Sequence, residues 1–163
     1  FQVQPIAGKH MLPYFGGSSS VWATSLLFFT TMLFVGYLYV YLLGRYSDAK
    51  QSRIHLYVVA VGGAAVLLSP LIWHSFYPPL NWTLGNSLHP SVEVLLALMM
   101  SIGVPYFLLS TTGPLLQYWY GITEKREPYK LYALSNIGSF LALGTYPFWV
   151  EPHLALRSTP RDP

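Results

Sequence analysis

The feature that most limits how this chain can fold is a set of long apolar runs with almost no charge. The clearest run, residues 21–44, reads VWATSLLFFTTMLFVGYLYVYLLG and contains no Asp, Glu, Lys or Arg. At about 1.5 Å of rise per residue, a helix of this length covers roughly 36 Å, and the hydrocarbon core of a bilayer is about 30 Å thick. The run therefore predicts a transmembrane helix.

Three further apolar runs follow, and composition agrees with lipid as their solvent. Hydrophobic residues make up 53% of the chain and charged residues only 9%, whereas soluble domains carry about 25% charged residues. The predicted spans are residues 21–44, 54–73, 92–120 and 129–150, the third kinked at Pro105 and Pro114. We expect an all-α membrane protein, with residues 1–163 forming one bundle of four transmembrane helices.

The N-terminal residues predict part of a further helix. The opening FQVQP reads as the end of a helix that Pro5 closes, because the residue before a proline avoids the helical region. No initiator Met and no signal-peptide pattern opens the chain. We expect the sequence to be a fragment of a longer chain.

Charge in the loops predicts the orientation of the bundle. Alternating spans place residues 45–53 and 121–130 on one side, and residues 74–91, which contain no Lys, Arg, Asp or Glu, on the other. The first two loops hold Arg45, Lys50, Arg53, Lys125, Arg126 and Lys130. Basic loops stay in the cytoplasm, so we expect these two loops to be cytoplasmic in a bacterial inner membrane.

Small residues mark two of the spans as helix-packing surfaces. In the fourth span, Ser135, Gly138, Ser139 and Ala142 recur at helical spacing on one face, with Asn136 beside them. Gly62 and Gly63 give the second span a thin waist. Small residues let helix backbones approach closely in lipid, and a buried amide needs a hydrogen-bonding partner. We expect the fourth span to be a packing helix at the centre of the bundle.

The third span carries a candidate polar site. Ser110, Thr111 and Thr112 precede Gly113-Pro114, where a helix could break, and Asn136 of the fourth span is a candidate neighbour. Broken helices bind substrates in some transporters. The simpler interpretation is a kink whose freed backbone is satisfied by these hydroxyls, and we favour it.

Most catalytic and cofactor chemistry has no counterpart in the sequence. The absence of cysteine rules out disulfides and thiolate metal sites, and no catalytic triad, phosphate loop or nucleic-acid-binding basic cluster is present. No metal site is expected. Glu93 and Glu151 lie near span ends, where solvation accounts for them. The five histidines (His10, His55, His74, His89 and His153) also lie in loops or at span ends. No cofactor is expected, although haem or chlorophyll ligation by an interfacial histidine stays open.

Four blocks of the sequence, in order over nearly the whole chain, carry a family resemblance. They are QPIAGKHMLPYFGGSSSVWATSLLFF, GYLYVYLL, PYFLLSTTGPLLQYWY and EPYKLYALSNIGSFLALGTYPFWVEP. They resemble the membrane part of bacterial fused major-facilitator/spermidine-synthase-like proteins, in which a hydrophobic helix precedes the QP segment. The resemblance implies membrane helices that can accompany an aminopropyltransferase-like domain, which binds decarboxylated S-adenosylmethionine and a diamine. Nothing of that domain lies in this chain, so no catalytic residue is implied here.

These observations favour a non-catalytic multi-helix membrane module over an enzyme. Its expected partners are the lipid bilayer and other transmembrane subunits or helices, with no nucleic acid. It would act as an accessory or structural subunit of a larger complex, such as a respiratory or photosynthetic assembly. The alternative is a transporter-like or polyamine-handling domain whose site lies at residues 110–114 near Asn136.

Overall fold

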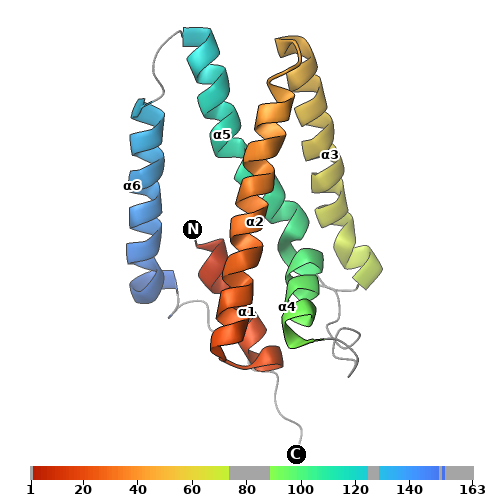
Figure 1. The fold of residues 1–163 in the computed structure, drawn as a ribbon, viewed down its shortest axis with the longest axis vertical. Coiled ribbons are helices and arrows are strands. Elements are labelled where there is room, and N and C mark those ends of the chain that lie inside the picture. The colour runs from red at the N-terminus through yellow and green to blue at the C-terminus, as the bar shows by residue number, and fades with distance from the viewer. Residues whose placement is uncertain (1, 74–88, 125–128, 151, 153–163) are drawn as a thin grey trace, which may run out of the picture.

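The fold is all-α, as the sequence predicts (Figure 1). The structure is a computed structural model that describes residues 2–73, 89–124, 129–150 and 152, and these contain no strand. The α-helices are α1 (Val3–Phe15), α2 (Ser19–Leu43), α3 (Asp48–Trp73), α4 (Pro90–Leu98), α5 (Val104–Glu124) and α6 (Tyr129–Thr145). Two π-helices continue them: η2 (Met99–Gly103) joins α4 to α5, and η3 (Tyr146–Val150) follows α6.

Three stretches in the described part of the chain are long and apolar enough to cross a membrane. They are Ser19–Leu43, Asp48–Leu71 and Pro90–Thr123, the last comprising α4, η2 and most of α5. They match the first three expected spans, although α3 starts at Asp48, earlier than residue 54. This length and composition identify a membrane protein. The helix α6 has 17 residues and is not among the three.

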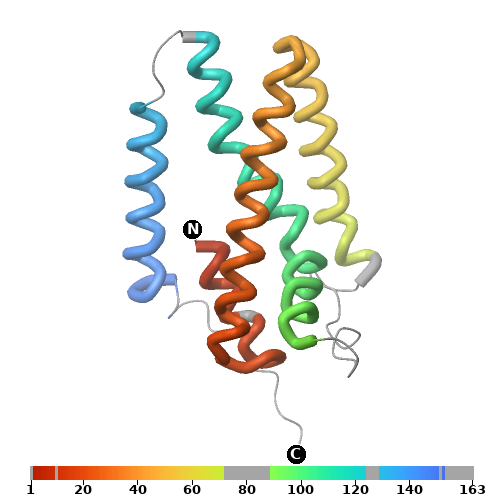
Figure 2. Tube along the Cα trace, viewed as in Figure 1, coloured from red at the N-terminus to blue at the C-terminus, as the bar shows by residue number. Residues whose placement is uncertain are grey.

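The helix α2 lies at the centre of the bundle, packing most closely on α5 and α4 (Figure 2). Its buried residues recur at helical spacing along one side: Val21, Thr24, Ser25, Phe28, Phe29, Met32, Gly36, Val40 and Leu43. Phe29 is the largest of the fully buried side chains and meets Tyr106 of α5 edge to face, with ring centroids 4.8 Å apart. Aromatic pairs in this arrangement add about 0.5–1.5 kcal/mol beyond their buried area. The core of the chain therefore lies between α1, α2, α4 and α5.

The helix α6 lies at the side of the bundle and not at its centre, contrary to expectation (Figure 1). None of its residues is buried, and its helix contacts are with α5 and with the start of α1. The small residues of a helix show that it can be approached closely. They do not show which helix of a bundle has the most neighbours, and here α2 has them.

The two loops that were expected on one side of the membrane are flanked by helix ends that lie at the same end of the bundle. The α2–α3 turn, the C-terminus of α5 and the N-terminus of α6 lie at one end of the bundle (Figure 1). We call this the basic end, because Arg45, Lys50, Arg53 and Lys130 belong to it. The C-terminus of α3 and the N-terminus of α4 lie at the other end. Lys125 and Arg126 fall outside the described residues.

Pro5, Pro105 and Pro114 lie in three different helical settings, and only Pro5 contradicts the expectation from the sequence. Pro5 lies in the first turn of α1 and starts a helix instead of closing one, since a first turn does not need the missing N–H. Pro105 follows the π-helix η2, where the carbonyl of Ser101 loses its usual donor and the backbone widens. At Pro114, α5 continues without a break.

Candidate functional site

A cleft of about 480 Å³ with several polar lining groups lies between α1, α2, α5 and α6. Four of its lining side chains are polar and uncharged: Gln2, Gln4, Tyr106 and Ser110. The others are Val3, Leu33, Leu109 and Ala142. Its size and its mixture of apolar walls with a few polar groups fall within the range of small-molecule sites.

The side chain of Gln2 spans this cleft and connects α1 to α6. Its Nε2 donates to the carbonyl of Ala142 at 3.4 Å and to Thr145 Oγ1 at 3.2 Å. The Thr145 hydroxyl donates in turn to the carbonyl of Leu141 at 2.7 Å. The helix α6 buries no side chain against α1 or α2. Hydrogen bonds from Gln2, and not apolar packing, therefore connect α6 to the start of α1.

Ser110 lies on the wall of the cleft, where α5 crosses α2. Its Oγ can donate to the carbonyl of Phe107 at 2.8 Å or to that of Met32 in α2 at 3.3 Å. Gly36 faces it from α2, and a Cβ added at Gly36 would clash with the Ser110 side chain and lie 3.1 Å from its backbone carbon. The spans α2 and α5 therefore cross in close contact at Gly36 and Ser110.

The other hydroxyls of the candidate polar site turn back to their own helix. Thr111 Oγ1 and Thr112 Oγ1 both donate to the carbonyl of Leu108, at 2.8 and 2.9 Å. Thr111 is fully buried, and Thr112 is exposed. Asn136 is exposed on α6, does not line the cleft, and makes no side-chain hydrogen bond with a described residue. The structure thus brings Ser110 to the cleft but leaves Asn136 outside it.

The small-residue face of α6 reaches the cleft only at Ala142, and it is not packed. Ser139 and Ala142 are half-buried, while Ser135 and Gly138 are exposed. A Cβ added at Gly138 would meet nothing within 4 Å. Ser139 Oγ donates to the carbonyl of Ser135 at 2.9 Å, so this hydroxyl is satisfied within the helix. The face is open to a further helix.

The two glycines at the waist of α3, Gly62 and Gly63, have different neighbours. A Cβ added at Gly62 would lie 2.9 Å from Leu108 Cδ1 and 3.3 Å from Val104 Cγ1, so α3 approaches α5 closely here. A Cβ added at Gly63 would meet nothing within 4 Å. Gly62 therefore packs against α5, whereas the added Cβ at Gly63 points into open space.

A polar and aromatic cluster at the basic end was missed by the sequence analysis. Trp119 Nε1 donates to Gln51 Oε1 at 2.9 Å, and Gln51 Nε2 donates to the carbonyl of Tyr46 at 2.7 Å. Tyr118 OH donates to the carbonyl of Gly44 at 3.1 Å. These bonds tie the α2–α3 turn to α5. The sequence offered Gln51 as an uncharged polar residue within the charged loop, but it did not identify a hydrogen-bonding partner for it.

The described histidines His55 and His89 and the carboxylate of Glu93 each lie in surroundings that suit a structural role. His55 Nδ1 lies 3.3 Å from Tyr39 OH, and the ring stands edge to face against Trp119. His89 Nδ1 accepts from Ser91 N at 3.3 Å and caps α4. Glu93 is buried in the first turn of α4, not solvated as expected, where the helix dipole favours a carboxylate. His74, Glu151, His153 and the side chain of His10 lie outside the described residues.

No cluster of three or more potential metal ligands occurs among the described residues. Ser101 lies within the π-helix η2, and its buried Oγ has no hydrogen-bond partner among the described residues. A π-turn displaces the carbonyl that a serine in an α-helix would use. We assign no ligand to this hydroxyl.

Comparison of the chain with family models, with curated proteins and with solved structures finds no match. The resemblance to the membrane part of spermidine-synthase-like proteins therefore stays an expectation from the sequence. The functional argument depends on the geometry of the chain.

Proposed function

We propose that the chain is a non-catalytic membrane module that packs with other transmembrane helices as an accessory or structural subunit of a larger complex. The observation that carries the proposal is the state of α6, which buries none of its residues although it carries a face of small residues. Helix association in lipid depends on close packing and interhelical hydrogen bonds. A helix whose small-residue face is not packed gains packing contacts when another transmembrane helix covers that face.

The proposal includes a fourth crossing of the membrane by α6. Together α6 and η3 run from Tyr129 to Val150, which is roughly 33 Å at helical rise, close to the thickness of the hydrocarbon core. The cluster of Arg and Lys at the basic end supports a cytoplasmic location for that end, in a bacterial inner membrane. Respiratory and photosynthetic assemblies are the kinds of complex in which such a subunit would serve.

Two glycine substitutions on α6 test the proposal. Gly138→Leu fills the small-residue face, while Gly144→Leu adds the same side chain about 120° further around the helix, away from that face. Both positions have open space within the chain, so neither variant disturbs its fold directly. We expect the wild-type protein, extracted from its own membrane in mild detergent, to migrate on a native gel as a complex larger than 18.4 kDa. Gly138→Leu should lose that complex and Gly144→Leu should keep it. A monomer in all three samples would refute the proposal.

The alternative is a transporter-like or polyamine-handling domain, and the cleft is the observation that favours it. Gln2, Gln4, Tyr106 and Ser110 offer hydrogen bonds at membrane depth. No carboxylate lines the described cleft, however, and a polyamine cation would need one. Titration with putrescine and spermidine separates the two functions: saturable binding that Tyr106→Phe weakens would favour the alternative, and no binding would exclude it.

A further inference from the structure

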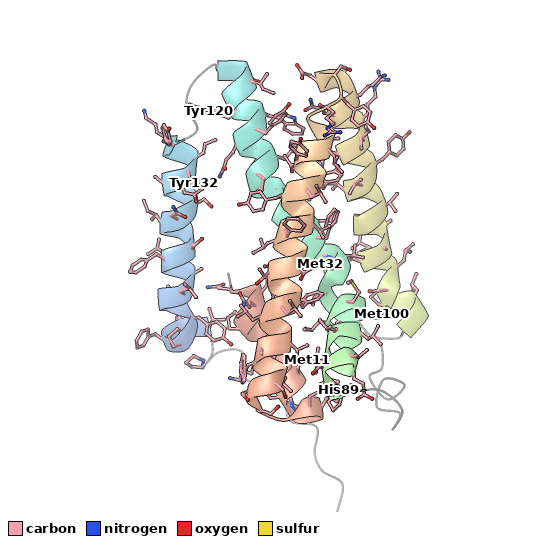
Figure 3. The ribbon with its side chains drawn as sticks, in the orientation of Figure 1. Met11, Met32, His89, Met100, Tyr120 and Tyr132 are labelled. Atoms are coloured by element: carbon pink, nitrogen blue, oxygen red, sulfur yellow. The ribbon has the colours of Figure 1, made fainter. Side chains whose placement is uncertain are left out.

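An apolar groove of about 740 Å³ lies on the opposite side of the bundle from α6 (Figure 1). It is bounded by α2, by α3 and by the continuous helix formed from α4, η2 and α5. Met32 of α2 and Met100 of η2 contribute to its walls, and both are labelled in Figure 3. Among its lining residues, Tyr57 carries the one polar side-chain group.

The groove lies along one stripe of α3. Tyr57, Val61 and Ala65 follow one another at intervals of four residues, so they stand one above another on the same face. From Tyr57 to Ala65 this stripe is about 12 Å long at helical rise. Gly62 lies beside it at the contact with α5 and forms part of the floor. The groove is thus elongated along the membrane normal.

Positive charge lies where this stripe reaches the basic end. Arg53 is four residues before Tyr57, one turn closer to the charged loop. It is exposed, and no described residue forms a hydrogen bond or ion pair with its guanidinium. Arg45 differs, because its guanidinium lies 5.1 Å from the Tyr41 ring centre and donates to Tyr41 OH at 3.3 Å. Arg53 is therefore available to an anion at the mouth of the groove.

We propose that the groove holds one acyl chain of an anionic phospholipid whose phosphate is bound by Arg53. An arginine binds phosphate oxygens with two parallel hydrogen bonds, and Tyr57 OH lies between phosphate and chain, at the level of the lipid ester groups. A transmembrane helix fits this groove less well, since its two glycines are already covered, Gly62 by α5 and Gly103 by Met99, and its walls offer no hydroxyl from Ser or Thr. Charge at one end and hydrocarbon along the rest match a lipid.

Native mass spectrometry of the full chain, released from micelles that contain phosphatidylglycerol or phosphatidylcholine with the same acyl chains, tests the assignment. We expect one phosphatidylglycerol per chain, retained about fivefold more than phosphatidylcholine, the factor that one arginine near an anionic lipid supplies. Arg53→Gln should make retention of the two lipids equal. Arg45→Gln, which removes the same charge from a residue already engaged with Tyr41, should leave the preference intact.

A groove-filling variant separates the acyl chain from the headgroup. Ala65 is exposed on the wall of the groove, so Ala65→Phe occupies the groove without entering the core. It should lose both lipids, and far-UV circular dichroism should show an unchanged helix content. Equal retention of the two lipids by the wild-type chain would overturn the proposal. So would undiminished lipid binding in a folded Ala65→Phe variant, or a wild-type mass corresponding to two copies joined without lipid.

Discussion

The crossing of α2 and α5 offers the sharpest test of the packing, through the substitution Gly36→Ala. The added methyl would overlap the Ser110 side chain and approach its backbone carbon to 3.1 Å, so the two helices must separate. Overpacking of this kind costs about 1–3 kcal/mol. The Ser110 hydroxyl keeps its hydrogen bond to the Phe107 carbonyl, and the better helix propensity of alanine returns about 0.5–1 kcal/mol. The free energy of unfolding should fall by about 0.5–2 kcal/mol.

Unfolding in mixed micelles of mild detergent and sodium dodecyl sulfate, followed by far-UV circular dichroism, measures this change. Gly63→Ala is the matched control, because a Cβ there meets nothing within 4 Å and should leave stability equal or slightly higher. Ser110→Gly removes the side chain that collides with the new methyl, so combining it with Gly36→Ala should recover part of the loss. If Gly36→Ala is as stable as Gly63→Ala, or if the double variant shows no recovery, the close crossing is wrong.

Three further substitutions probe the remaining contacts. Gly62→Leu should lower the free energy of unfolding by about 1–3 kcal/mol, because it pushes α3 from α5, while Gly63→Leu should change it by less than about 0.5 kcal/mol; equal losses would contradict the one-sided waist. Gln51→Leu leaves the Trp119 indole N–H without its acceptor and should cost about 1–3 kcal/mol, with an altered tryptophan emission spectrum, whereas an unchanged spectrum and stability would argue against the bond. Thr111→Val should cost about 1 kcal/mol or less, since its hydroxyl bonds only within α5, and a much larger loss would indicate a role beyond the helix.

The positions of the membrane helices could be predicted from the sequence because their cause is local. A charge-free run of sufficient length satisfies its backbone as a helix in lipid whatever its neighbours are. The order of packing could not be predicted. The helix α2 is hydrophobic all round, so no polar face marks which side is buried, and its contact residues emerge only from the crossing at Gly36 and Ser110.

Part of the candidate site was predictable for a similar reason. Ser110, Thr111 and Thr112 bond to carbonyls within four residues along α5, as hydroxyls in apolar helices do. The bridge from Gln2 to α6 joins residues 140 or more positions apart, and the bond from Trp119 to Gln51 joins residues 68 apart. Such pairs depend on tertiary placement, which no local pattern in one sequence records.

The account's central claim is that protein covers the small-residue face of α6 in the native membrane. The chain has no cysteine, so a single introduced cysteine carries a nitroxide spin label at a unique position. Oxygen accessibility of labels at residues 135, 138 and 142, and at 137, 140 and 144 on the opposite face, reads lipid exposure directly. In native membranes we expect low accessibility at the first three positions and high accessibility at the others. At residue 138 the purified chain in liposomes should show high accessibility, because no described atom lies near that site. High oxygen accessibility at all six positions in native membranes would contradict the account.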